Sequence, residues 1–159
     1  MHDRDAVFPI GFHFDSQPID EQIPADSDRS SFFVDDGCTG PQDLAGCDVI
    51  VEAVFEDREL KAKVTKAADA KLTDEAIFAS NTSGLPITDL AKASSRPENF
   101  IGLHFFSPVE RMQMVEIVVG GKTSDQTLAK AWDFILAIKK AGIVVNDSPG
   151  FYTSRVFGT

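Results

Sequence analysis

The sequence has few of the residues that mark secreted, metal-binding or nucleic-acid-binding proteins. It contains 2 cysteines, Cys38 and Cys47, without histidines at metal-ligand spacing, which favours reduced thiols in a cytoplasmic protein over a disulfide or a zinc site. Lysine and arginine number 15 against 25 aspartates and glutamates, and the absence of a basic stripe argues against nucleic acid as a partner. No apolar run approaches the roughly 20 residues of a membrane span.

The composition is that of a globular protein, and the charges are unevenly distributed along the chain. Hydrophobic residues make up 43% of the 159 positions and charged residues 25%, which is enough for one domain with a buried core. Residues 1–46 hold ten acidic residues against Arg4 and Arg29, together with four of the 8 prolines. We therefore expect residues 1–46 to form an irregular acidic leader, with the folded body beginning at residue 47.

Apolar residues from position 48 onward follow two alternating periodicities. Short runs rich in β-branched and aromatic residues predict buried strands at 48–54, 76–80, 100–106, 114–119 and 143–146. Helical spacing predicts helices at 57–72, with Asp57 as the N-cap, at 86–90, and at 123–141, which Gly142 would end. Strands that alternate with helices predict α/β architecture with a largely parallel sheet.

Polar side chains gather where the predicted strands end. Glu56 follows the first strand, a polar turn that contains Asn81 and Ser83 follows the second, and His104 lies near the end of the third. The carboxyl ends of parallel strands form the edge at which α/β proteins bind their ligands. The sequence therefore predicts a site at this edge.

His104 and Glu116 both interrupt apolar strands, where a polar side chain requires a partner. If the two strands are neighbours, the carboxylate can pair with the imidazole and orient it as a base. Spacing alone leaves two interpretations open, a catalytic dyad or a satisfied core histidine beside a strand-end glutamate. No Gly-x-Ser-x-Gly elbow and no glycine-rich phosphate loop occurs in the chain.

Five segments in series resemble the L-3-hydroxyacyl-CoA dehydrogenase family. They are Asp48–Glu56 (DVIVEAVFE), Ala79–Leu85 (ASNTSGL), Phe100–Pro108 (FIGLHFFSP), Met114–Ile117 (MVEI) and Val145–Phe151 (VNDSPGF). The resemblance covers about residues 43–155. Residues 107–112 and 150–155 are most similar to the dehydrogenase part of multifunctional fatty-acid oxidation proteins.

The resemblance implies oxidation of an L-3-hydroxyacyl-CoA to a 3-ketoacyl-CoA with NAD, in fatty-acid β-oxidation and without a metal. It assigns His104 as general base, Glu116 as the residue that orients His104, and Ser83 as a hydrogen-bond donor to the reacting oxygen. It also assigns contacts to NAD and to the substrate; NAD would contact Ala53, Glu56, Lys61 and Asn81, and the acyl-CoA would contact Ser83 and Ser154. The implied partners are the acyl-CoA substrate and either a homo-oligomer or a multifunctional β-oxidation complex.

Two departures from the family pattern shape the predicted fold. Residues 1–46 lack the family's pattern of an apolar strand followed by a Gly-x-Gly-x-x-Gly turn and a helix, and residues 151–159 would be only the start of the family's helical C-terminal domain. We therefore expect a partial Rossmann-like, doubly wound parallel sheet over residues 47–150, whose first strand (49–53) exposes an unpaired edge.

Three interpretations of such a chain stay open. It is a fragment of a dehydrogenase, a non-catalytic binding or structural module derived from one, or an enzyme that a separate subunit completes.

Overall fold

The computed structural model describes residues 10–12 and 44–157, with side chains from 44 to 156. One sheet holds six strands in the order of the chain: β1 (Ile10–Phe12), β2 (Val49–Glu52), β3 (Ile77–Ser80), β4 (Phe100–Phe105), β5 (Met114–Val119) and β6 (Ala141–Asn146). The pairs β2–β3, β3–β4 and β5–β6 are parallel, whereas β1–β2 and β4–β5 are antiparallel. The prediction of a largely parallel α/β sheet is confirmed.

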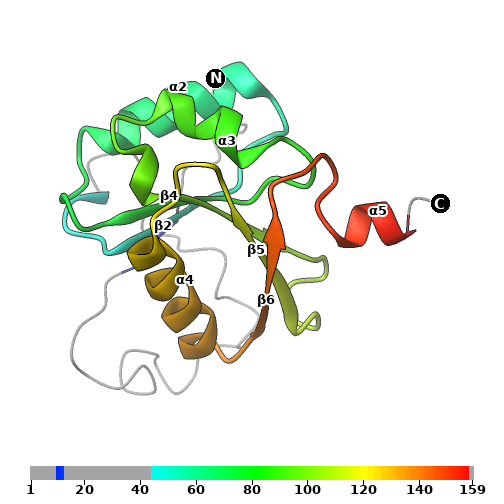
Figure 1. Cartoon of the computed structure of the whole chain (residues 1–159). Coiled ribbons are helices and arrows are strands. Elements are labelled where there is room, and N and C mark those ends of the chain that lie inside the picture. The colour runs from blue at the N-terminus through cyan, green and yellow to red at the C-terminus, as the bar shows by residue number, and fades with distance from the viewer. Residues whose placement is uncertain (1–9, 13–43, 158–159) are drawn as a thin grey trace, which may run out of the picture.

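Helices cover both faces of the sheet, as a doubly wound fold requires. The connections contain α2 (Arg58–Asp69), α3 (Ile87–Leu90), the 3₁₀ turns Ala91–Ala93 and Pro97–Asn99, α4 (Asp125–Ala137) and α5 (Thr153–Phe157). Figure 1 shows α2 and α3 on one side of the sheet and α4 on the other. Within the described ranges, no helix is long and apolar enough to span a membrane.

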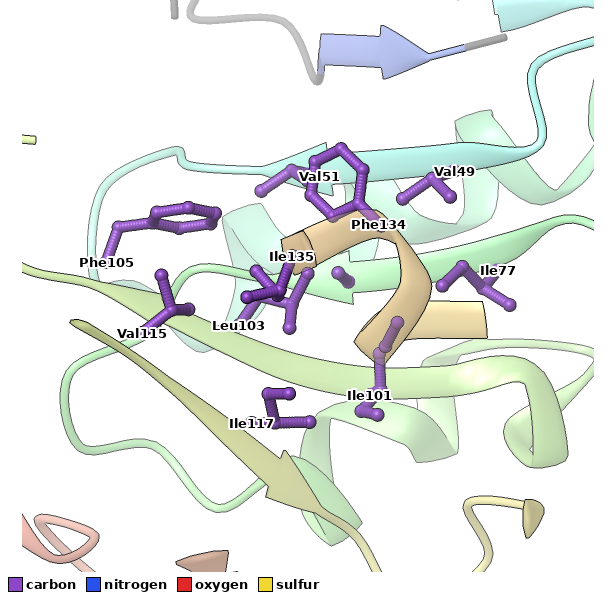
Figure 2. Packing of buried hydrophobic residues seen from close by; sticks show 12 residues of the cluster. Val49, Val51, Ile77, Ile101, Leu103, Phe105, Val115, Ile117, Phe134 and Ile135 are labelled. Carbon is purple, nitrogen blue, oxygen red and sulfur yellow. The ribbon is translucent and has the colours of Figure 1, made fainter. Parts of the chain in front are cut away.

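Strand alternation divides the apolar residues between two cores. One core packs against Phe134 and Ile135 of α4, and its strand residues include Val49, Val51, Ile77, Ile101, Leu103, Phe105, Val115 and Ile117 (Figure 2). The second core lies under α2 and α3 and includes Ile50, Phe78, Phe100 and Val118. His104 and Glu116 alternate with the residues of the first core, so both side chains point toward the second.

The capping signals locate the helix starts more accurately than the helix ends. Asp57 Oδ1 accepts a hydrogen bond from Leu60 N at 2.7 Å, which confirms Asp57 as the N-cap of α2. The expected end of α4 at residue 141 is wrong. Lys139 has φ 58°, and the amides of Lys139 and Lys140 bond the carbonyls of Leu136 and Ile135, respectively. This Schellman closure ends α4 at Ala137 and lets β6 begin at Ala141, ahead of Gly142.

The expected unpaired edge of β2 is occupied in this structure. Ile10–Phe12 form β1, which pairs antiparallel with Val49–Val51, so backbone groups of β2 have partners on that side. The rest of the predicted leader up to residue 43 lies outside the described residues, and so does Cys38. Cys47 is present as a buried thiol.

Gly102 in β4 is the position where the packing leaves no room for a side chain. A Cβ there would lie 2.7 Å from Ile87 Cδ1 and 2.8 Å from Val118 Cβ. We expect Gly102→Ala to lower the free energy of unfolding by about 1–3 kcal/mol, because overpacking forces neighbours out of their rotamers. Chemical denaturation measures the change. Gly84→Ala is the matched control, since a Cβ at Gly84 meets nothing within 4 Å. Equal stability of the two variants would contradict the conclusion that the packing around Gly102 has no room for a Cβ.

Candidate active site

The predicted site residues lie at one end of the sheet because of how the strands pair. Parallel pairing aligns Glu52 of β2 with Ser80 of β3, so the segments that follow both strands leave the sheet at the same edge. β4 runs parallel to β3, and His104 is its second-last residue. The carboxyl ends of β2, β3 and β4 therefore bring together Glu56, the turn at residues 81–84 and His104.

His104 and Glu116 form a direct cross-strand pair. The antiparallel register places them opposite one another, and His104 Nδ1 lies 2.7 Å from Glu116 Oε2. Both residues are buried, with Glu116 at 0% exposure. The imidazole also lies against the rings of Phe106 and Phe151, with centroids 4.6 Å and 5.9 Å away. The predicted contact between the two side chains is confirmed, and it engages Nδ1 rather than Nε2.

The second oxygen of Glu116 is held by backbone groups that the sequence did not point to. Glu116 Oε1 accepts hydrogen bonds from the amides of Tyr152 at 3.1 Å and Thr153 at 2.8 Å. Both carboxylate oxygens therefore have partners within the described residues, although the side chain is fully buried. A buried carboxylate is stable when charge-assisted hydrogen bonds of this kind replace its hydration.

Glu56 holds the turn that carries Ser83. Its Oε1 accepts hydrogen bonds from Thr82 Oγ1 at 2.5 Å and from the amides of Ser83 and Gly84, each at 3.1 Å. Partial burial by itself would raise the pKa of Glu56, but the bond from Thr82, the nearby charge of Lys61 and the two amides together lower it. Ser83 is exposed on this turn.

The pKa of Glu56 is lower in the folded state than in an ordinary glutamate, so ionised Glu56 stabilises the fold at pH values above the ordinary glutamate pKa. This contribution is lost as the pH falls through the pKa of the folded state. We expect the Glu56 carboxyl resonance to titrate below the ordinary value of 4.5, and Thr82→Val to move its midpoint upward by removing a hydroxyl donor. Carboxyl ¹³C NMR measures both. Thr73→Val, at an exposed position, should leave the midpoint in place. An unchanged midpoint in Thr82→Val would count against this account.

Lys61 is buried in a charged network rather than open to a cofactor. Its Nζ donates to Glu52 Oε1 at 2.8 Å and to the carbonyl of Val54 at 3.1 Å, and it lies 3.8 Å from Glu56 Oε2. Glu52 Oε2 in turn accepts from Ser80 Oγ at 2.8 Å. Glu52 was not among the residues predicted from the sequence, although a carboxylate within the apolar run VIVEAV, nine positions before a lysine on the next helix, was a usable signal.

The other three residues predicted for the site differ in how exposed they are. Asn81 Oδ1 accepts a hydrogen bond from the amide of Phe105 at 3.1 Å, which joins the ends of β3 and β4. Ala53 is exposed directly after β2, and Ser154 is exposed on α5. Ser154 follows Thr153, whose amide reaches Glu116, and this places α5 beside the dyad.

Comparison with protein families shows which family contains this arrangement of residues. The model of the 3-hydroxyacyl-CoA dehydrogenase NAD binding domain matches residues 33–148. The chain belongs to the 3-hydroxyacyl-CoA dehydrogenase family. The predicted family and the cofactor of this domain, NAD, are confirmed.

Relatives of the 3-hydroxyacyl-CoA dehydrogenase family extend well beyond this chain. The fatty acid oxidation complex subunit alpha of Shewanella sp. (strain W3-18-1) is 50% identical over 109 residues, which are 69% of this chain and 15% of that protein. The corresponding subunit of Shewanella loihica is 50% identical over 113 residues, or 71% of this chain and 16% of that protein. The chain thus spans about 15% of the length of these curated relatives.

Solved structures of dehydrogenases share the fold. (S)-3-hydroxybutyryl-CoA dehydrogenase PaaH1 from Ralstonia eutropha is 41% identical with a TM-score of 0.73, over 76% of this chain and 42% of that one. The dehydrogenase part of multifunctional enzyme 1 from C. elegans is 35% identical with a TM-score of 0.67, over 74% of this chain and 26% of that one. The partial Rossmann-like fold predicted from sequence is confirmed.

Proposed function

We propose that this chain carries the catalytic half of the NAD-binding domain of an L-3-hydroxyacyl-CoA dehydrogenase of fatty-acid β-oxidation. The observation that carries the proposal is the buried pair of His104 and Glu116, whose nitrogen and oxygen lie 2.7 Å apart at the carboxyl end of β4. The open turn at Ser83 lies at the same edge. This combination supplies a base and a hydroxyl donor beside the edge at which Rossmann-type sheets bind dinucleotides.

The reaction removes a hydride from C3 of the hydroxyacyl group and a proton from its hydroxyl. NAD bound beside Ala53, Glu56 and Asn81 would supply the hydride acceptor. Nε2 of His104 takes the hydroxyl proton, because Nδ1 faces Glu116. Glu116 holds the ring and stabilises the imidazolium that forms, as an acid partner does in other dyads. Ser83 donates a hydrogen bond to the reacting oxygen, and we assign the exposed Ser154 to contact with the acyl-CoA.

The residues around β2 fit the nicotinamide half of NAD in part. Ala53 is small and exposed, Glu56 is partly exposed, and Asn81 is half-buried, so these three can border a flat ring at the sheet edge. Lys61 is 1% exposed and its ammonium is held by Glu52 and Val54. We therefore assign Lys61 to orienting Glu56 rather than to direct contact with the cofactor.

The partners and domains of the whole protein follow from the same proposal. Residues 47–150 form the second half of the NAD-binding domain, and residues 151–159 begin a helical domain that would complete the acyl-CoA cleft. The match to subunits of a fatty acid oxidation complex supports a multifunctional β-oxidation complex as the assembly, with a homo-oligomer as the alternative. The cysteine usage supports a cytoplasmic location.

Activity is tested on a completed enzyme. Residues 47–159 replace the matching segment of a multifunctional dehydrogenase, and NADH formation from L-3-hydroxybutyryl-CoA is followed by absorbance. We expect turnover that depends on this segment. A well-folded hybrid that binds both NAD and acyl-CoA but forms no NADH would refute the function and favour a non-catalytic module.

The chain by itself should bind NADH weakly. The pyrophosphate of a dinucleotide normally rests on the amides of a Gly-x-Gly-x-x-Gly turn, and residues 1–46 contain no such motif. We expect a dissociation constant of about 1 mM or weaker, which corresponds to roughly −4 kcal/mol. Fluorescence titration with NADH measures it, and the completed hybrid is the control. A micromolar constant for the chain alone would show that another segment holds the pyrophosphate.

A further inference from the structure

The connection from β6 to α5, residues 147–152, is held by hydrogen bonds at its start to α3 and at its end to β5. At its start, Asp147 accepts hydrogen bonds from the amides of Ile87 at 2.8 Å and Thr88 at 2.7 Å, at the beginning of α3. At its end, the amides of Tyr152 and Thr153 both reach Glu116 Oε1. Figure 1 shows this connection, in red, leaving the end of β6 on the side of α3 before it enters α5. The connection therefore links the dyad to the helix that follows the Ser83 turn.

The backbone of this connection adopts a shape that aims two amides at one atom. Gly150 has φ 75° and Phe151 has φ 48°, so two consecutive residues are left-handed. A residue with a Cβ takes this conformation only where its surroundings hold it. Phe151 is 2% exposed and its ring lies 5.9 Å from that of His104. Packing of the Phe151 ring beside the imidazole thus holds the turn in place.

We propose that the amides of Tyr152 and Thr153 are positioning groups of the dyad. Successive backbone amides that converge on one oxygen form an anion-binding concavity, and here the anion is the carboxylate of Glu116. The amides hold Oε1 so that Oε2 faces His104 Nδ1. The assignment of His104 as the base rests on the proposed function, whereas the effect of the amides on the imidazole does not.

The consequence of this arrangement is a single imidazole tautomer. A carboxylate fixed at Oε1 accepts the proton of Nδ1 at Oε2, which leaves the lone pair on Nε2. Without the amides, Oε1 loses the groups that hold Oε2 against His104, and the selection of Nδ1–H weakens. The hydroxyl of Thr153 has no hydrogen-bond partner within the described residues, although it is buried. The amide of Thr153, and not its side chain, is therefore the contributing group.

The experiment compares loss of the amide donor of residue 153 with loss of its side-chain hydroxyl. Thr153 is the first residue of α5, a position where helices tolerate proline, so Thr153→Pro deletes the N–H donor. Thr153→Val keeps the amide and loses only the unpartnered hydroxyl. Both variants are made in the full chain with ¹⁵N-labelled histidine. Long-range ¹H–¹⁵N spectra then report the tautomer of His104, assigned by comparison with His104→Gln.

We expect one Nδ1–H tautomer in the native chain and in Thr153→Val, and loss of this single-tautomer signature in Thr153→Pro. If Thr153→Pro does not fold, an ester at residue 153, introduced as the α-hydroxy analogue of threonine, removes the same donor without a ring. An unchanged tautomer in a folded proline or ester variant overturns the proposal, and so does a changed tautomer in Thr153→Val. The spectra do not depend on turnover, so failure of the dehydrogenase assay is a separate result.

Discussion

Replacing His104 with glutamine in the completed enzyme should lower kcat by about 10²–10⁴-fold, the usual contribution of a general base. Glutamine keeps a polar side chain of similar size, so binding of the acyl-CoA should change little and KM should stay near its original value. Steady-state kinetics of NADH formation measure both constants, and thermal melting of the same samples establishes that the variant is folded.

Two comparison variants separate catalysis from structure. Glu116→Gln should also lower kcat, but by less, because His104 stays in place and loses only its charged partner. Glu98→Gln, at an exposed position just before β4 begins, removes the same kind of charge far from the dyad and should leave kcat unchanged. A purely structural pair would instead lower the melting temperature in both dyad variants while each folded molecule stayed active. Normal kcat in folded His104→Gln would remove the base assignment.

The buried ion pair of Lys61 and Glu52 should produce the largest effect on stability. Both side chains are 1% exposed and their charged atoms are 2.8 Å apart. Lys61→Met leaves Glu52 charged and without this partner in the interior, and breaking a buried pair in this way costs about 3–5 kcal/mol. A domain has a total stability of about 5–15 kcal/mol, so we expect a large shift in the urea midpoint.

A double variant tests whether the unpaired charge of Glu52 is responsible for the loss of stability. The double variant Glu52→Gln, Lys61→Met removes both charges, so it should be more stable than Lys61→Met alone. Lys66→Met is the matched control on the exposed side of α2, and its stability should stay within about 0.5 kcal/mol of the original. If Lys61→Met were as stable as Lys66→Met, the buried pair of Lys61 and Glu52 would not contribute to the stability of the domain.

Much of the fold could be predicted because strand formation depends on local pattern. The runs at 49–52 (VIVE) and 77–80 (IFAS) are short and mostly apolar, and both are strands buried along their whole length. The N-cap at Asp57 was likewise predictable, since a capping side chain acts within three residues of its own position. Helix α4 was harder to delimit because Lys139 ends it through backbone geometry, with no glycine to mark the turn.

The sequence by itself determined the chemical groups of the site and their order along β2, β3, β4 and β5. His104 and Glu116 were identifiable as polar residues in apolar strands, and the family resemblance supplied their roles. Only the tertiary structure decided how these groups are held. The antiparallel register puts His104 opposite Glu116, and the left-handed turn at Gly150 brings two amides to Glu116 from 36 and 37 positions away. Backbone amides occur at nearly every position, so no residue type marks the ones that bind a distant carboxylate.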